Sequence, residues 1–233
     1  MALLRVEGVT RRFGGIVAVD DVSLDVGEGE IVGLIGPNGA GKTTVFNLIT
    51  RLYRPESGEI EFAGESLLRT APHGVVRRGI ARTFQNVELF GSMTVLEHVL
   101  MGRHARRGRR AREILGYVTL GPHAHRQARE LPYGLQKRVE LARALASGPR
   151  LLLLDEPAGG LNHEEVEELG GLIRRIRDDF ELTVLLVEHH MGLVMSVADR
   201  VHVLDFGRKI AEGTPAEVQG DKKVIEAYLG ADS

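Results

Sequence analysis

The chain has 233 residues, of which 43% are hydrophobic and 27% are charged, and its formal net charge at pH 7 is −2. This composition is typical of a soluble globular protein, and the charge balance excludes a global basic field for nucleic acid. The absence of cysteine excludes a disulfide framework and any zinc or iron–sulfur site with cysteine ligands.

The first part of the chain predicts short strands around one helix. Residues 3–9 and 17–26 alternate between apolar and polar side chains, as half-buried strands do, and the apolar run 31–35 predicts a buried strand. We expect a helix over about 42–52 and a further half-buried strand at 58–65. Arg-rich helical material is expected through the middle third of the chain.

In the last part of the chain, apolar strands alternate with helices. Continuous apolar runs predict buried strands at 151–154 and 183–187, with a helix over about 163–178 between them. Residues 199–215 predict a hairpin, and a short helix is expected around 221–229. Alternation of this kind indicates an α/β fold with a mostly parallel, helix-covered sheet, to which the N-terminal strands add an antiparallel part.

The sequence GPNGAGKTT at 36–44 matches the phosphate-binding pattern G-x-x-x-x-G-K-[ST] between a predicted strand and a predicted helix. Glycines let the backbone N–H groups of such a loop curl around a phosphate, and the helix N-terminus adds partial positive charge. The lysine reaches the outer phosphates, and the first threonine hydroxyl offers a ligand to Mg²⁺. The predicted nucleotide site comprises Gly36, Pro37, Asn38, Gly39, Ala40, Gly41, Lys42, Thr43 and Thr44.

Acidic and histidine side chains follow the two later buried strands. Asp155 and Glu156 come directly after the strand 151–154, at the edge where ligands of parallel sheets bind. We expect Asp155 to hold Mg²⁺ and Glu156 to act as the base for an attacking water. His189 and His190 emerge at the same edge, and one of them is a candidate contact of the γ-phosphate.

Taken in this order, the motifs resemble the ATP-binding subunits of ABC transporters over essentially the whole chain. Phe13 in RRFGG stands where the family has an aromatic that stacks on adenine, and Gln85 in RTFQNVELF stands at the Q-loop residue between Mg²⁺, water and the transport subunit. His189 takes the place of the switch histidine. LPYGLQ takes the place of the signature, which acts on a partner's ATP, and DEPAGGLN contains the D-loop, residues 159–162. The resemblance therefore adds Pro132, Tyr133, Gly134, Leu135, Gln136, Gly160 and Asn162 to the site.

This resemblance implies a P-loop NTPase (RecA-like) core with an antiparallel β subdomain, formed by residues 1–85 and 149–233, and an inserted helical signature subdomain at 86–148. It implies ATP and Mg²⁺ as cofactors, with Lys42 and Glu156 acting in hydrolysis. It also implies a second ATPase subunit, identical or related, two membrane permease subunits and, indirectly, an extracytoplasmic solute-binding protein. The N-terminus predicts no signal peptide and the apolar runs are too short to span a bilayer. We therefore expect a cytoplasmic protein held at the inner face of the cell membrane by its permeases.

Within this family, the chain is most similar to the subunits that energise uptake of branched-chain amino acids. RTFQNVELF, LPYG, DEPAGGLN, EHHMGLVMSVADRVHVLDFG and the ending GTPAEV…VIEAYLG carry this resemblance. The stretch between Val99 and Glu130 is shorter than is typical of that subgroup. The alternatives are an importer of urea or of another amide or amino acid, a lipopolysaccharide exporter and a non-transport ATPase acting on DNA or ribosomes. The basic patch 103–112 predicts a solvated surface, with a lipid or nucleic-acid contact as the other reading.

The signature itself departs from the family pattern. Pro132 stands where the usual signature has Ser, and no Ser, Thr, Asp or Asn side chain precedes the helix that follows. Free backbone N–H groups at that helix start are available to a phosphate. Because proline offers neither a hydroxyl nor an N–H, we expect weaker ATP-driven dimerisation than in a relative with serine.

Overall fold

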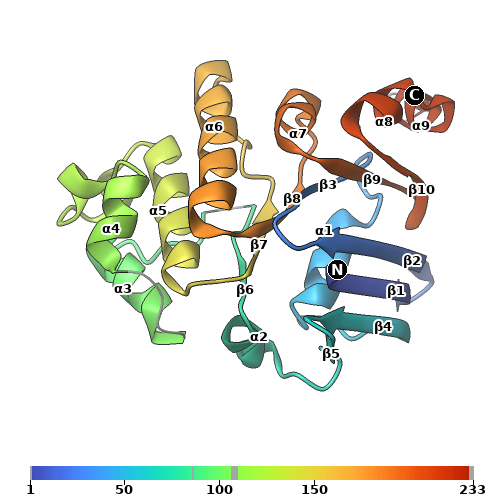
Figure 1. Cartoon of the computed structure of the whole chain (residues 1–233), viewed down its shortest axis with the longest axis horizontal. Coiled ribbons are helices and arrows are strands. Elements are labelled where there is room, and N and C mark those ends of the chain that lie inside the picture. Colours follow the sequence, from blue (N-terminus) through green and yellow to red (C-terminus); the bar gives the residue numbers. More distant parts are fainter. Residues whose placement is uncertain (1, 86, 106–109, 231–233) are drawn as a thin grey trace.

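Two β-sheets and a group of helices make up the computed structural model (Figure 1). It describes the whole chain except residues 1, 86, 106–109 and 231–233. The centre of the expected basic patch and the first residue of the expected helical subdomain therefore lie outside the described residues. The helices α3, α4 and α5 gather at one end of the molecule and the antiparallel strands at the other.

The larger sheet has the strand order β10-β9-β3-β8-β7-β6 within the described residues. All neighbouring pairs from β9 to β6 are parallel, and β10 pairs with β9 in the antiparallel sense. Its strands are β3 (Ile31–Ile35), β6 (Ile80–Arg82), β7 (Leu151–Asp155), β8 (Thr183–Val187), β9 (Arg200–Asp205) and β10 (Arg208–Gly213). The carboxyl ends of β3, β7 and β8 meet at one edge, which is where the predicted motifs begin.

The smaller sheet is antiparallel and has the order β2-β1-β4-β5 in the described part of the chain. It consists of β1 (Ala2–Phe13), β2 (Ile16–Gly27), β4 (Ser57–Phe62) and β5 (Glu65–Ser66). Its apolar side chains and those of α1 (Lys42–Ile49) form one buried cluster with one face of the parallel sheet. The first helix is therefore held between the two sheets, which fixes the loop that precedes it.

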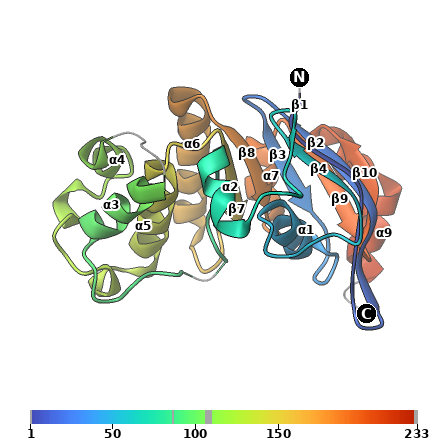
Figure 2. The same ribbon diagram turned by 90° about the horizontal axis from the view of Figure 1, so that it is seen from below.

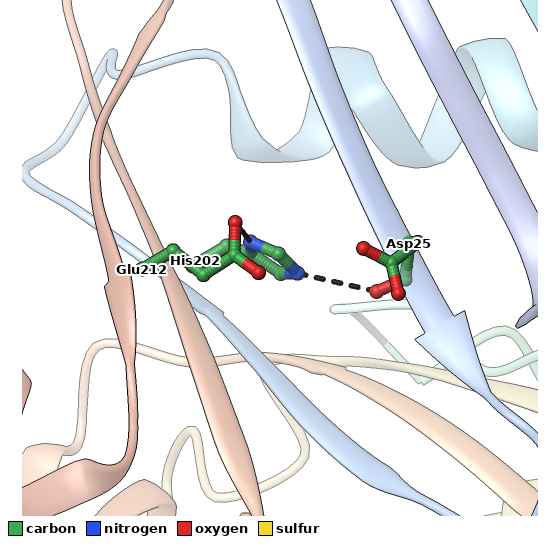
Figure 3. A group of neighbouring side chains, drawn as sticks. All are labelled: Asp25, His202 and Glu212. Atoms are coloured by element: carbon green, nitrogen blue, oxygen red, sulfur yellow. Dashed lines mark hydrogen bonds and ion pairs between the residues drawn. The ribbon is translucent and has the colours of Figure 1, made fainter.

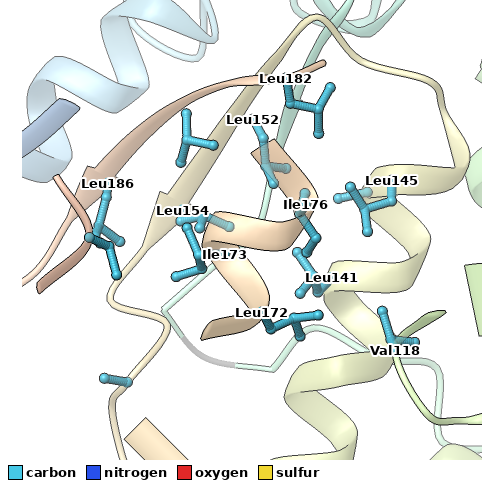
Figure 4. Close-up of a cluster of buried hydrophobic side chains, with 14 of the residues drawn as sticks. Val118, Leu141, Leu145, Leu152, Leu154, Leu172, Ile173, Ile176, Leu182 and Leu186 are labelled. Carbon is cyan, nitrogen blue, oxygen red and sulfur yellow. The ribbon is translucent and has the colours of Figure 1, made fainter. Parts of the chain in front are cut away.

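Alternation along the buried strands sends side chains to two separate cores. In β7, Leu151 and Leu153 pack on the α1 side, whereas Leu152 and Leu154 pack toward α6 (His163–Phe180). Figure 4 shows the second core, in which apolar side chains of α5 and α6 meet those of β7 and β8. Because both faces of these strands are buried, their sequences read as unbroken apolar runs.

Three of the remaining α-helices lie together at one end of the molecule. The end seen at the left of Figure 1 contains α3 (Val95–Ala105), α4 (Ala111–Tyr117) and α5 (Tyr133–Ala146). Figure 2 shows these helices beside the parallel sheet and far from the antiparallel one. The other helices are α2 (Pro72–Arg78), α7 (Met191–Val197), α8 (Pro215–Gly220) and α9 (Lys222–Gly230). No helix in the described ranges combines the length and the apolar character that crossing a membrane requires.

A charged network ties the antiparallel sheet to the edge of the parallel one. Arg200 on β9 forms ion pairs with Asp25 on β2, with Glu30 and with Glu212 on β10. The fully buried His202 lies beside it, with Nε2 3.2 Å from the carbonyl oxygen of Asp25, and burial lowers the pKa of His202 (Figure 3). The carboxylates already face the guanidinium, so the group is a structural ion-pair network that joins the sheets.

The predicted fold class is confirmed, and the buried strands at 31–35 and 183–187 have the predicted bounds. Three predictions were wrong. The strand expected at 58–65 is interrupted by a turn at residues 63–64, between β4 and β5. The first helix ends at Ile49 rather than near residue 52, because Arg51 takes a left-handed φ of 63°. The Arg-rich middle third also contains a strand, β6, whose three residues pair with β7. So short a strand has no periodicity of its own, and it is specified by its partner.

Candidate active site

The loop between β3 and α1, called the phosphate cradle below, turns at three glycines with positive φ. Gly36, Gly39 and Gly41 have φ values of 150°, 80° and 102°, which side chains rarely tolerate. A Cβ on Gly36 would lie 2.1 Å from the carbonyl oxygen of Leu204, and one on Gly41 would lie 2.5 Å from that of Ala18. Close backbone approach therefore requires glycine at two of the three positions. Gly41 precedes α1 without a side-chain cap, so the helix N-terminus is open to an anion.

Lys42 lies within this cradle. The residue is 6% exposed, and its Nζ donates hydrogen bonds to the carbonyl oxygens of Gly36 at 2.7 Å and Pro37 at 2.9 Å. Burial lowers the pKa of Lys42, and the negative charges of Glu156, Asp155 and Glu188 oppose that change. The ammonium thus already sits where the loop would receive phosphate. Of the other predicted residues, Asn38, Gly39 and Thr43 are exposed, Pro37 and Thr44 are half-buried and Ala40 is buried.

Asp155 ends β7 and is 2% exposed. Its Oδ2 accepts a hydrogen bond from Arg82 Nη2 at 2.6 Å, whereas its buried Oδ1 has no hydrogen-bond partner among the described residues. A free carboxylate oxygen and a threonine hydroxyl, such as that of Thr43, are the hard oxygen donors that Mg²⁺ prefers. The donor set therefore suits the expected metal. Sequence reasoning missed Arg82, because only tertiary pairing brings it to Asp155.

Glu156 meets two of the other predicted site residues. Its carboxylate Oε2 accepts a hydrogen bond from Gln85 Nε2 at 2.6 Å and lies 3.7 Å from Nδ1 of His189. The backbone of Glu156 has a φ of 45°, a conformation that costs a non-glycine residue about 1–3 kcal/mol. Its N–H is held by the carbonyl oxygen of Val187 at 2.9 Å. In this structure the side chain of Gln85 thus donates its hydrogen bond to the expected base, Glu156, and not to Asp155.

The two adjacent histidines have different surroundings. His190 precedes α7, and its Nδ1 accepts a hydrogen bond from the backbone N–H of Leu193 at 3.2 Å. His189 has a side chain 58% exposed that points close to Glu156. The capping contact occupies His190, so the geometry favours His189 as the histidine available to a ligand.

A buried carboxylate that was given no role beforehand supports this edge of the sheet. Glu188 is fully buried, and it accepts hydrogen bonds from the backbone N–H groups of Ala158, His189 and His190 at 2.7, 3.0 and 3.1 Å. These contacts join the chain after β7 to the chain after β8. Glu188 therefore fixes Glu156 and His189 relative to each other. A polar residue closing an apolar run was the only signal in the sequence.

The helix α5 begins at Tyr133, and Pro132 before it makes no side-chain capping hydrogen bond. The uncapped start expected from the sequence is thus present. Tyr133 is 42% exposed and packs against the D-loop, since a Cβ on Gly160 would lie 2.9 Å from Tyr133 Cε1. Gly134, Leu135 and Gln136 are half-buried, and Gln136 Nε2 donates to the carbonyl oxygen of Leu131 at 2.8 Å.

Charged side chains of α5 hold the Q-loop. Lys137 Nζ donates to the carbonyl oxygen of Gln85 at 2.7 Å, and Arg143 Nη1 donates to that of Glu88 at 2.6 Å. Glu140 accepts from the N–H of Phe84 at 3.1 Å, and burial raises the pKa of Glu140. The helix that begins at the signature is therefore bonded directly to the segment carrying Gln85.

Two further predicted residues, Asn162 and Phe13, contact neighbouring residues of this chain. Asn162 caps α6: its side chain accepts from the N–H of Glu165 at 3.0 Å, and Glu165 returns a bond to the N–H of Asn162. Phe13 ends β1 and is 38% exposed, with its ring 5.0 Å from that of Tyr53 and 4.7 Å from the guanidinium of Arg11. Phe13 thus offers an exposed aromatic face beside the β1–β2 turn.

Comparison with protein families gives two matches. Residues 19–159 match the model of the family described as ABC transporter, and residues 208–233 match the model described as branched-chain amino acid ATP-binding cassette transporter. The first match covers more than half of the chain and includes the phosphate loop, the Q-loop, the signature and the two acidic residues after β7.

Curated proteins with similar sequences align over nearly the whole chain. The high-affinity branched-chain amino acid transport ATP-binding protein BraF of Pseudomonas aeruginosa is 43% identical to this chain. The high-affinity branched-chain amino acid transport ATP-binding protein LivG of Salmonella typhimurium is 45% identical. Each alignment covers 98% of both proteins. These alignments extend over 249 positions, more than the 233 residues of this chain. The relatives therefore have residues without a counterpart here.

Solved structures share the fold. The crystal structure of the ADP conformation of an ATP-binding cassette of an ABC transporter superposes with a TM-score of 0.90 at 31% identity, covering 99% of each chain. A nucleotide-free ATP-binding cassette from an ABC transporter also gives 0.90, at 30% identity. The arrangement of the two sheets and the helical end is thus that of an ATP-binding cassette.

Proposed function

The chain belongs to the ATP-binding subunits of ABC transporters, and on that premise we propose that it hydrolyses ATP to energise the uptake of branched-chain amino acids. The observation that carries the hydrolytic part is the contact of Glu156 with Gln85 and His189 at the edge where the phosphate cradle opens. The C-terminal family match and the names of the relatives support the substrate class.

We propose that the cradle holds the phosphates of ATP through its backbone N–H groups and the Lys42 ammonium, which leaves its present carbonyl partners as phosphate arrives. Phe13 stacks on the adenine. Thr43, Asp155 and Gln85 would hold Mg²⁺, which would neutralise charge at the phosphate oxygens. The phosphate-binding residues are those predicted from the sequence: Gly36, Pro37, Asn38, Gly39, Ala40, Gly41, Lys42, Thr43 and Thr44.

We propose that Glu156 orients and deprotonates the attacking water, with Gln85 and His189 at its side. The hydrogen bond from Gln85 fixes the carboxylate in position, and His189 steadies the transferred phosphoryl group. A base within hydrogen-bond reach of a positioned water typically accelerates such a step by about 10²–10⁴-fold. The buried support from Glu188 keeps the two loops in register during this step.

A complete site requires a second ATPase subunit, identical or related. We propose that residues 86–148 form the helical subdomain and that 1–85 with 149–233 form the core of each subunit. In a head-to-tail dimer, the uncapped start of α5 faces the γ-phosphate of the partner's ATP, and its N–H groups and helix dipole stabilise charge there. The signature residues Pro132, Tyr133, Gly134, Leu135 and Gln136 act on that ATP, with Gly160 and Asn162 of the D-loop beside them.

A groove of about 360 Å³ between α2, α3 and α5 is the surface that we propose for the permease. Leu52, Phe84 and Met101 line it, and both Leu52 and Phe84 are well exposed, at 54% and 38%. Such apolar side chains on a member of this family suit a segment of a membrane partner. Two permease subunits then hold the dimer at the inner face of the cell membrane, and a solute-binding protein acts through them.

Uptake in cells tests this function. Deletion of the gene is expected to lower ATP-dependent uptake of radiolabelled leucine, with recovery by the wild-type gene and none by Glu156→Gln. Unchanged leucine uptake with lost urea uptake would transfer the proposal to a urea importer. Unchanged uptake together with a defect in lipopolysaccharide export, or association of the protein with ribosomes or DNA, would contradict the proposed function.

The substitution Pro132→Ser is expected to strengthen ATP-driven dimerisation. Serine restores a hydroxyl and a backbone N–H at the start of α5, both directed to the partner's γ-phosphate. Sedimentation velocity of Glu156→Gln protein with ATP, with and without Pro132→Ser, measures the dimer fraction. A Pro132→Ala variant is the matched control, because it restores the N–H alone. An unchanged dimer fraction in the serine variant would mean that these missing contacts are not limiting.

A further inference from the structure

A buried guanidinium lies between the elements that carry two of the three proposed metal ligands, Thr43 and Asp155. Arg82 ends β6, and its side chain is 7% exposed. Nη2 donates to Asp155 Oδ2 at 2.6 Å, and Nη1 donates to Asn47 Oδ1 at 2.6 Å. Asn47 is one turn beyond Thr43 on α1. Arg82 therefore links the helix that presents Thr43 to the strand that presents Asp155.

Packing fixes this guanidinium in place. The rings of Phe46 and Phe84 have centroids 5.5 and 5.0 Å from its central carbon, and Nη1 is also 3.3 Å from Thr50 Oγ1. Arginine stays charged in a protein interior, and its planar fork makes two directed contacts at once. A lysine at this position would keep the charge but would lack the fork.

The contact determines which oxygen of Asp155 is available. Arg82 occupies Oδ2, whereas Oδ1 is buried and has no hydrogen-bond partner among the described residues. Lys42 is bonded to loop carbonyls, and among the described residues Arg82 is the cation that forms an ion pair with Asp155. An ionised carboxylate this deeply buried needs such a partner.

We propose that Arg82 is a positioning residue that balances the charge of Asp155, holds its Oδ1 free for the metal and keeps α1 at a fixed spacing from β7. Through it, Thr43 and Asp155 retain their relative placement while nucleotide and metal exchange. This inference rests on the proposed roles of Thr43 and Asp155. It adds to them a residue outside the phosphate loop and outside the acidic pair.

Binding of Mn²⁺ to the ADP-loaded protein, followed by electron paramagnetic resonance, tests the proposal. Arg82→Lys is expected to weaken Mn²⁺ binding roughly tenfold, as loss of a group that orients a ligand does. Asn47→Ala removes only one acceptor of the Nη1 arm of Arg82. This variant is also expected to weaken Mn²⁺ binding, but by a smaller factor. Arg78→Met removes an exposed ion pair with Glu65 and serves as the control with no change.

Stability gives an independent measurement. Arg82→Met leaves Asp155 buried without a counter-ion, so the melting temperature without metal is expected to fall by on the order of 10 °C. Should this variant not fold, Arg82→Lys still decides the question. Wild-type Mn²⁺ affinity in Arg82→Lys would overturn the positioning role. Asp155→Asn separates the two proposals: if it binds Mn²⁺ normally, the proposed metal role of Asp155 fails as well.

Discussion

Replacement of Glu156 by Gln is expected to lower the rate of ATP hydrolysis by about 10²-fold or more while ATP binding persists. The amide has the size of the carboxylate but cannot take a proton from water. Glutamine, like glutamate, has to adopt the left-handed backbone at this position, where φ is 45°. We therefore expect no change in stability from backbone strain. Phosphate release measures the rate, and equilibrium binding of a fluorescent ATP analogue measures affinity.

The same variant is expected to accumulate an ATP-bound dimer, because closure no longer leads to hydrolysis. Sedimentation velocity with ATP and with ADP distinguishes this state from the monomer. Glu167→Gln is a suitable control, because Glu167 is an exposed residue of α6 whose carboxylate lies 3.3 Å from Nε2 of His163. Normal turnover by Glu156→Gln would assign the base to another group, with His189, whose Nδ1 lies 3.7 Å from the Glu156 carboxylate, as the next candidate.

Gly36→Ala is expected to disrupt both the phosphate cradle and the sheet beside it. The new Cβ would lie 2.1 Å from the carbonyl oxygen of Leu204, which belongs to β9 and cannot move without displacing that strand. We expect this close contact and the left-handed φ of 150° together to lower the free energy of unfolding by about 3 kcal/mol or more. ATP affinity is expected to fall steeply, since the N–H groups no longer converge.

Gly39→Ala is the matched control within the same loop. Gly39 also has a positive φ, 80°, but a Cβ there meets open space. Only the backbone penalty applies, about 1–2 kcal/mol. Urea denaturation of the two variants and of the wild type measures the difference. Equal losses would show that the close approach to Leu204 has no energetic weight.

Much of the core could be predicted because buried segments are recognisable from the local pattern of apolar residues. Strands covered on both faces must be apolar throughout, so 31–35, 151–154 and 183–187 are recognisable as runs. The residues that follow such runs must emerge at one sheet edge, which brings the phosphate loop, Asp155, Glu156 and His189 together. The uncapped start of α5 is equally local, since it depends on the absence of a capping side chain.

What the sequence could not specify is which polar groups meet across long separations. Arg82 pairs with Asp155 across 73 positions and Phe84 with Glu140 across 56, and no periodicity encodes either contact. Glu188 and the strand β6 take their roles from the chain packed against them. The sequence by itself determined the family, the phosphate cradle and the buried strands, because these follow from local spacing and burial. Only the tertiary structure decided how the carboxylates are paired and held, because directional hydrogen bonds form where folding brings distant segments into contact.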